Sequence, residues 1–211
     1  MVFVVGCLVQ VGLAWWLEPR LLILLAVAWV YLALMGVEFF ARDWLVARPI
    51  HYLWTHMLIM PLVDLFATGC DWLPAGSAVH GGLVVFLFVS FLNGLVIEFG
   101  RKLRAVEDEE EGVPTYTRLW GVRLAPMIWL GAMTGCGILA VIAARGIEFS
   151  LPVGLVLGSV LILATWAALR FRKQSSSSNA KVFEKISGVW TLALYLMLGL
   201  IPMLVQNGLP S

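Results

Sequence analysis

Uninterrupted apolar stretches take up most of the chain. A bilayer-spanning helix needs about 20 mostly apolar residues, so windows of that length without central charges predict transmembrane helices. Seven such windows occur, at residues 1–17, 21–41, 50–70, 79–99, 123–145, 150–170 and 187–206. The pattern therefore predicts an all-α fold, a polytopic transmembrane helix bundle of about seven spans.

Composition agrees with lipid as the solvent. Of the 211 residues, 61% are hydrophobic, and the mean hydropathy is +0.94, which excludes an ordinary soluble globular domain. The net charge of +1 gives no general attraction to nucleic acid, so no nucleic-acid partner is expected. No connection is long enough to fold separately, and residues 1–211 are therefore predicted to form a single integral-membrane domain.

The basic residues are distributed unevenly. Twelve of the fourteen Lys and Arg residues fall in or beside the connections 42–49, 100–123 and 171–186, and only Arg20 and Arg145 fall on the other side. Positive charge in short loops stays in the cytoplasm, so these three connections are predicted to be cytoplasmic. By alternation, the C-terminus faces away from the cytoplasm, and the chain begins on the cytoplasmic side.

The densest group of charges follows the window 79–99. From Glu98 to Glu111 the chain carries nine charged residues. On a helix, Glu98 has Arg101 and Lys102 at i+3 and i+4, positions that favour ion pairs. The charge run is also compatible with a solvated loop. A carboxylate at the edge of the hydrocarbon is costly, however, and therefore suggests a functional site at Asn93 and Glu98.

Asn and carboxylate oxygens beside cationic side chains suit one particular kind of ligand. Mg²⁺ takes one or two protein carboxylates and fills its remaining positions with water and substrate phosphates. Adjacent Arg and Lys residues would bind the same phosphates. At the mouth of an apolar bundle, this combination suggests a diphosphate with a lipid tail.

The same stretch resembles the second conserved loop of the UbiA superfamily of intramembrane prenyltransferases. The similarity is carried by Asn93, Glu98, Arg101, Lys102, Glu107, Asp108, Gly112, Thr115, Tyr116, Leu119 and Gly121. The segment 37–71 also looks like the preceding helix-loop-helix in an uncharacterised bacterial subgroup. The resemblance implies nine helices around a cytoplasmic cavity, of which this chain would hold spans 3–9.

What the resemblance implies can be stated residue by residue. Asn93, Glu98 and Asp108 would bind Mg²⁺ as catalytic residues, and Arg101, Lys102 and Arg104 would contact an isoprenyl diphosphate. The isoprenyl group would pass to a small aromatic or lipid acceptor. The location would be a bacterial inner membrane, with the active face in the cytoplasm. The superfamily's first Asp-rich motif has no counterpart in the chain, so two helices and half of the metal site are expected to be missing.

Other polar residues lie within the apolar windows. His56 and Asp64 are eight residues apart, on one face of a predicted helix, and are candidates for a polar cavity. A hydrogen-bonded structural role is the alternative for both. Glu38 has Arg42 at i+4, which predicts a local ion pair.

Two other classes of function stay open. A proton-coupled transporter would use Asp64, His56 and Glu98 as a polar path, although the windows 123–145 and 150–170 contribute no interior charge. A non-catalytic subunit or pseudoenzyme would keep the bundle without the chemistry, and the absent first motif favours this reading.

Overall fold

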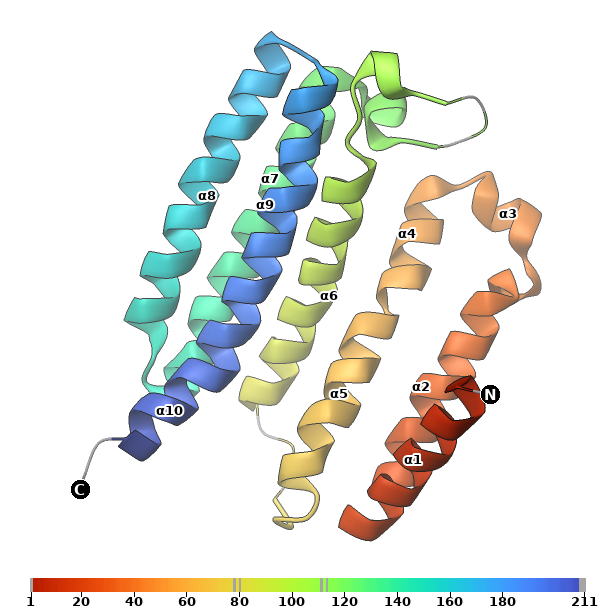
Figure 1. The fold of residues 1–211 in the computed structure, drawn as a ribbon, viewed down its shortest axis with the longest axis vertical. Helices are drawn as coiled ribbons and strands as arrows, with labels where there is room; N and C mark the ends of the chain where they lie inside the picture. Colours follow the sequence, from red (N-terminus) through yellow and green to blue (C-terminus); the bar gives the residue numbers. More distant parts are fainter. Residues whose placement is uncertain (1, 78, 80, 111, 113, 209–211) are drawn as a thin grey trace. The chain divides into compact units, whose positions relative to one another are not determined.

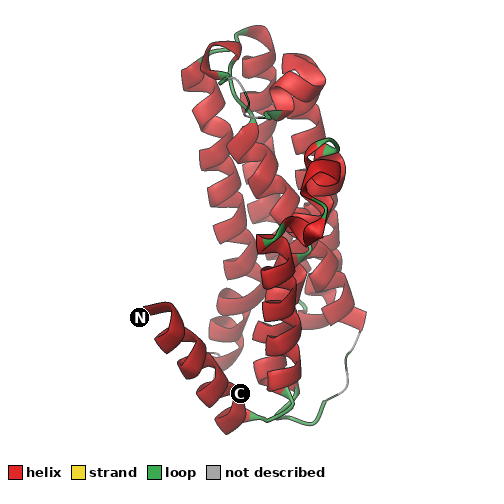
Figure 2. Cartoon of the chain, turned by 90° about the vertical axis from the view of Figure 1, so that its right-hand side faces the viewer, coloured by secondary structure: helices red, strands yellow, loops and turns green. Residues whose placement is uncertain are grey.

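The computed structural model describes residues 2–208 except 78, 80, 111 and 113, and the described residues contain helices and loops without strands (Figures 1 and 2). The first half holds α1 (Val2–Leu17), α2 (Leu21–Gly36), η1 (Glu38–Phe40), α3 (Arg42–Val46), α4 (Pro49–Met57), α5 (Ile59–Trp72) and α6 (Gly81–Lys102). The second half holds η2 (Val106–Asp108), α7 (Tyr116–Ala143), η3 (Ala144–Ile147), α8 (Ser150–Lys173), α9 (Ser177–Tyr195), the π-helical turn η4 (Leu196–Leu200) and α10 (Ile201–Gly208). The all-α prediction is confirmed.

Five helical segments of the described chain are long and apolar enough to cross a bilayer: Pro49–Trp72, Gly81–Lys102, Tyr116–Ile147, Ser150–Lys173 and Ser177–Val205. Each overlaps one of the predicted windows. The two remaining windows form shorter apolar helices, α1 and α2, of 16 residues each. At about 1.5 Å per residue, 16 residues rise about 24 Å, somewhat less than the hydrocarbon thickness of a typical bilayer.

The chain divides into two compact units, residues 1–91 and 92–211, so the boundary falls inside α6. In the first unit, α2 packs against both α1 and α5. Its core is a cluster of Ala14, Leu21 and Leu25, flanked by partly buried side chains that include Phe66 and Leu73. Arg20, just before α2, donates a hydrogen bond to the carbonyl of Leu73, just after α5, at 3.2 Å.

In the second unit, α8 packs against both α7 and α9. Three aromatic rings form its centre: Phe183 makes edge-on contacts with Trp129, at a centroid distance of 4.9 Å, and with Phe171, at 5.1 Å. Ser187 links three helices, because its hydroxyl accepts from the Trp129 indole N–H at 3.0 Å and donates to the Val96 carbonyl at 3.1 Å. These contacts fix α6, α7 and α9 against one another.

Two helix boundaries differ from the sequence pattern. The helix of the window 79–99 runs beyond that window: α6 ends at Lys102, and the buried Leu103 and Ala105 follow it outside the helix. The connection 171–186 was expected to be a loop, but α9 already begins at Ser177. The Ser176 hydroxyl caps it by accepting from the Asn179 amide at 3.4 Å. The result is a short connection beside the charged segment.

Candidate functional site

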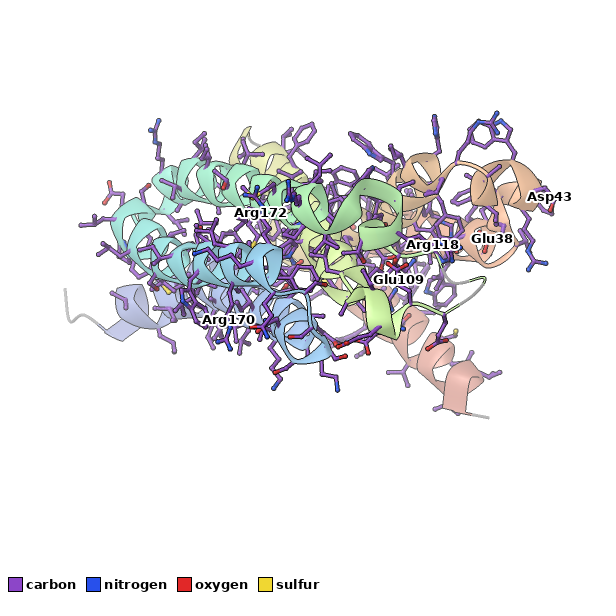
Figure 3. The ribbon with its side chains drawn as sticks, turned by 90° about the horizontal axis from the view of Figure 1, so that it is seen from above. Glu38, Asp43, Glu109, Arg118, Arg170 and Arg172 are labelled. Carbon is purple, nitrogen blue, oxygen red and sulfur yellow. The ribbon has the colours of Figure 1, made fainter. Side chains whose placement is uncertain are left out.

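The candidate site lies at the end of the second unit where α6 and α8 finish and α7 and α9 begin (Figure 1). Figure 3 looks onto this end, where Glu109 of the loop, Arg118 of α7, and Arg170 and Arg172 of α8 are labelled. Direct contacts join the two connections there, since Ser177 of α9 bonds to Glu107 of η2. The connections 100–123 and 171–186 therefore lie at the same end of this unit.

Glu98 forms a compact charged cluster with two cations of the same helix. One of its carboxylate oxygens lies 2.7 Å from Arg101 Nη2, and the other lies 2.7 Å from Lys102 Nζ. The Glu98 side chain is 8% exposed, whereas that of Arg101 is 62% exposed. The predicted i+3 and i+4 ion pairs are thus present, and they hold the Arg101 guanidinium at the surface of the site.

Asn93 is fully buried between α6 and α9. Its Oδ1 accepts a hydrogen bond from Thr191 Oγ1 at 3.0 Å, while its Nδ2 has no partner among the described residues. Asn93 thus faces α9, while Glu98 is engaged by cations of its own helix. Five residues of helix turn their side chains about 140° apart, which accounts for this divergence.

The acidic residues of η2 are held by the first residue of α9. The Ser177 amide and hydroxyl bond to Glu107 Oε1 at 2.9 and 2.7 Å, and the same hydroxyl lies 2.7 Å from Asp108 Oδ1. These two hydrogen bonds lower the pKa of Glu107 below its usual value. A hydroxyl has one proton, so it cannot donate fully to both carboxylates. The arrangement therefore leaves one carboxylate oxygen with capacity for a further cation or donor.

The rest of the charged loop is fastened to the start of α7. The Arg104 amide donates to Thr117 Oγ1 at 3.2 Å, and Thr115 Oγ1 donates to Glu109 Oε1 at 3.0 Å. Thr115 also caps α7, because its hydroxyl accepts from the Arg118 amide at 3.1 Å. Glu110 lies 3.5 Å from Arg104 Nη1. Glu111, the last acid of the run, lies outside the described residues.

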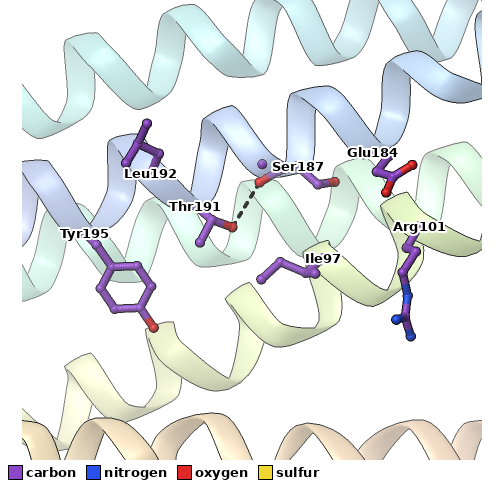
Figure 4. A pocket seen from close by; sticks show the side chains of 8 residues that line it. Ile97, Arg101, Glu184, Ser187, Thr191, Leu192 and Tyr195 are labelled. Carbon is purple, nitrogen blue, oxygen red and sulfur yellow. Dashed lines mark hydrogen bonds between the residues drawn. The ribbon is translucent and has the colours of Figure 1, made fainter.

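Two adjoining pockets are lined by these elements. The mouth pocket, of about 520 Å³, lies between the loop and the start of α9, and its charged lining residues are Arg101, Arg104, Lys181, Glu107, Asp108, Glu109, Glu110 and Glu184. The inner pocket, of about 430 Å³, lies between α6 and α9 (Figure 4). Its lining combines Ile97 and Leu192 with the polar Ser187, Thr191 and Tyr195. Arg101 and Glu184 line both pockets, so the two pockets adjoin at these residues.

The electrostatics of the mouth pocket restrict its ligands. Three cationic and five anionic side chains line it, which gives a formal charge of −2. A bare diphosphate would meet net repulsion there, whereas a diphosphate that carries divalent cations would not. The mouth is therefore suited to a cation–phosphate complex.

The donor atoms suit Mg²⁺ at only some of the predicted positions. Glu107 and Asp108 present carboxylate oxygens on either side of one hydroxyl, which fits an ion that takes one or two protein carboxylates. The polar atoms of Glu98 are already engaged by two cations. Within the described residues, no group of three His, Cys, Asp or Glu side chains is arranged to hold a metal by itself. The geometry thus brings Asp108 together with Glu107 rather than with Asn93 and Glu98.

The cavity candidates His56 and Asp64 lie in the first unit. The helix is interrupted at Leu58 between α4 and α5, so the two residues no longer share one continuous helix face. His56 contacts Glu38, with Nε2 and Oε2 3.3 Å apart. Asp64 is partly buried, and its carbonyl accepts from Thr68 Oγ1 at 2.7 Å. Glu38 thus pairs with His56. Its i+4 spacing had instead suggested an ion pair with Arg42.

Several site residues escaped the sequence analysis, namely Ser177, Lys181, Glu184 and Thr191. Ser177 lies in a serine run that is typical of a flexible connector, and only its capping position marks it as structured. Lys181 and Glu184 are three residues apart at the start of α9, a helical spacing that could have identified a charged helix face. Thr191 carries no signal apart from its polarity within an apolar span.

Comparison with known proteins adds no assignment: no protein-family model, curated protein or solved structure matches the chain.

Proposed function

We propose that the chain is a UbiA-like prenyltransferase that transfers an isoprenyl group from a Mg²⁺-bound isoprenyl diphosphate to an aromatic or lipid acceptor. The observation that carries the proposal is the pair of adjoining pockets, one charged and one mainly apolar, that share Arg101 and Glu184. An amphipathic substrate with a phosphate head and a hydrocarbon tail has the same division. The resemblance of the segment 93–121 to the second UbiA loop supports the same reading.

Each part of the site has a role in this proposal. Glu107 and Asp108 would hold Mg²⁺, which neutralises charge on the departing diphosphate when bound. Arg101, Arg104 and Lys181 would contact the phosphate oxygens, and Glu98 would position Arg101 and Lys102. Tyr195 and Leu192 would line the path of the tail in the inner pocket.

The chemistry of the transfer follows from these placements. The allylic C–O bond breaks, and its electron pair leaves with the diphosphate. The acceptor then forms the new bond to the isoprenyl carbon and gives up one proton. The cationic side chains at the mouth stabilise the charge that develops on the leaving group, so their effect is greatest in the transition state.

We also propose the finer topology. All seven apolar segments would span the bilayer, with α1 and α2 as the shortest spans, and the mouth pocket would face the cytoplasm of a bacterial inner membrane. The excess of Lys and Arg around the mouth supports this orientation.

Binding of farnesyl diphosphate to the purified chain of residues 1–211, with and without Mg²⁺, tests the proposal. We expect Mg²⁺-dependent binding that weakens about tenfold in Lys181→Gln, a loss of about 1.4 kcal/mol. Lys185→Gln is the matched control, because Lys185 lies one turn further along α9 and does not line the mouth pocket. Equal binding of farnesol, which lacks the phosphates, would contradict the proposal.

The same protein separates the rival functions. Release of diphosphate in the presence of an acceptor supports transfer, whereas binding without release supports a non-catalytic subunit. Ion flux into proteoliposomes that depends on Asp64 and not on Lys181 would instead support a transporter.

A further inference from the structure

The basic residues at the end of the second unit that carries the mouth pocket have two kinds of surroundings. Arg101 and Lys102 are paired with Glu98, and Arg104 is paired with Glu110. A second group of exposed cations lies on α7 and α8 and consists of Arg123, Arg170, Arg172 and Lys173. Within the described residues, none of these four side chains forms an ion pair. The α7 and α8 side of this end therefore carries positive charge that no carboxylate neutralises.

Two arginines of this second group are held by uncharged partners. Arg172 Nη1 lies 3.6 Å from the sulfur of Met127, so its side chain reaches from α8 to α7. The guanidinium carbon of Arg170 lies 5.2 Å from the centre of the Trp166 ring, one turn earlier on α8. A thioether and an indole can position a guanidinium without neutralising it. The charge of both side chains is thus available to an anion.

The four cations form a continuous band across the adjacent ends of α7 and α8. Arg170 and Arg172, both labelled in Figure 3, are two residues apart, so they leave the helix on nearly opposite sides, and Lys173 lies between them. Arg123 lies one turn before Met127, the residue of α7 that Arg172 contacts. We refer to these four residues as the α7–α8 cationic band.

The cationic band lies above an apolar face of α8. Leu155, Ile162 and Leu169 recur every seven residues on one side of the helix and are 66%, 71% and 47% exposed. Lys173 follows Leu169 by one turn and continues the same face. The helix is long and apolar enough to cross a bilayer. In a membrane this face would meet acyl chains, and the cationic band would lie at the level of the headgroups.

From this combination we propose that the α7–α8 cationic band is a binding site for an anionic phospholipid of the surrounding membrane. The lipid phosphate accepts hydrogen bonds from Arg172 and Lys173, while an acyl chain lies along Leu169 and Ile162. The site is separate from the two pockets, and it does not depend on the proposed transferase activity.

The charge of the band and the apolar face select this ligand together. A zwitterionic lipid carries a cationic group of its own, which four unpaired cations would repel, so a headgroup with net negative charge is favoured. A small soluble anion would gain only exposed ionic contacts, which salt screens. A phospholipid adds the contact of its acyl chain with α8, and that contact distinguishes it from free phosphate.

Thermal unfolding of the purified chain of residues 1–211 in detergent, with added phosphatidylglycerol or an equal amount of phosphatidylcholine, tests the site. At about five times the Kd, phosphatidylglycerol should raise the unfolding temperature by about 2–4 °C more than phosphatidylcholine does. This difference should be lost in a variant that carries both Arg172→Gln and Lys173→Gln. It should persist in Arg145→Gln, the matched control, because Arg145 is an exposed arginine beyond the opposite end of α8.

A direct binding measurement keeps the test decisive if the double variant fails to fold. In native mass spectrometry, the wild-type chain in an equal mixture of the two lipids should retain mainly phosphatidylglycerol. Glycerol phosphate at the same concentration, which has the phosphate without acyl chains, should not displace it. Equal retention of both lipids, or displacement by glycerol phosphate, would overturn the proposal. So would a thermal difference that survives in the double variant or disappears in Arg145→Gln, since the latter indicates a general effect of charge.

Discussion

At Phe40, the free-energy cost of the left-handed backbone conformation can be measured separately from other contacts. Its φ is 57° and its side chain is 84% exposed, so truncation removes few contacts within the protein. Glycine adopts this conformation freely, whereas alanine retains the Cβ clash. We therefore predict that Phe40→Gly unfolds at a higher temperature than Phe40→Ala, by a difference equivalent to about 1 kcal/mol.

Both variants lack the phenyl ring, so the effect of its loss cancels in the difference between their unfolding temperatures. In an ordinary helix interior the order would be reversed, because glycine there is about 1 kcal/mol less favourable than alanine. Thermal unfolding in one detergent measures the difference. An Ala variant that is the more stable of the two would show that the turn is right-handed in the protein.

At the scale of elements, α6 and α9 approach each other closely at Gly100. A Cβ at Gly100 would overlap the Ser187 side chain and would lie 3.0 Å from the Phe183 carbonyl oxygen. Backbone cannot move aside as a flexible side chain can, so the helices would have to separate. We predict that Gly100→Ala destabilises the protein by about 1–3 kcal/mol.

Gly131→Ala is the matched control for this prediction. Gly131 lies inside α7, and a Cβ there would meet nothing within 4 Å. Helix propensity then dominates, and the variant should be neutral or more stable by up to about 1 kcal/mol. Similar unfolding temperatures for the two variants would argue against the close contact of α6 and α9.

The ends of elements were harder to predict from the sequence than their centres. Apolar windows located the five helical segments of the described chain that are long enough to cross a bilayer, because burial in lipid requires long apolar runs. It could not show that α9 begins at Ser177, since the polar residues of its first turns resemble a loop. The acidic run gave no sign that Ser177 holds Glu107, because the two residues are 70 positions apart in the chain.

The whole molecule should cross the membrane with a defined orientation. Ser178, in the first turn of α9, and Gly146, in η3, are both exposed and lie near opposite ends of α8. We predict that Ser178→Cys reacts with a membrane-impermeant maleimide only from the cytoplasmic side, and that Gly146→Cys reacts only from the other side. The wild-type protein, with Cys7, Cys70 and Cys136, provides the background. Labelling of both variants from one side would refute the alternation of spans.

The candidate site was predictable only in part. Helical spacing alone identified the Glu98 pairs with Arg101 and Lys102, because i+3 and i+4 contacts are local. The convergence of Glu107 and Asp108 on Ser177 depends on how separate helices pack, which one sequence does not specify. The Glu38–His56 pair arises from a left-handed turn at residues that normally avoid it, so local preferences pointed to the wrong partner.

Ser187 belongs both to the helix junction and to the lining of the inner pocket. Its hydroxyl joins Trp129 to the Val96 carbonyl, and the same residue lines the pocket. A ligand that competes for this hydroxyl would weaken the connection between α6 and α7. Its affinity would be lower, because part of its binding free energy would be used to break that connection. By thermodynamic reciprocity, any change that stiffens the three-helix junction alters how readily the pocket is filled.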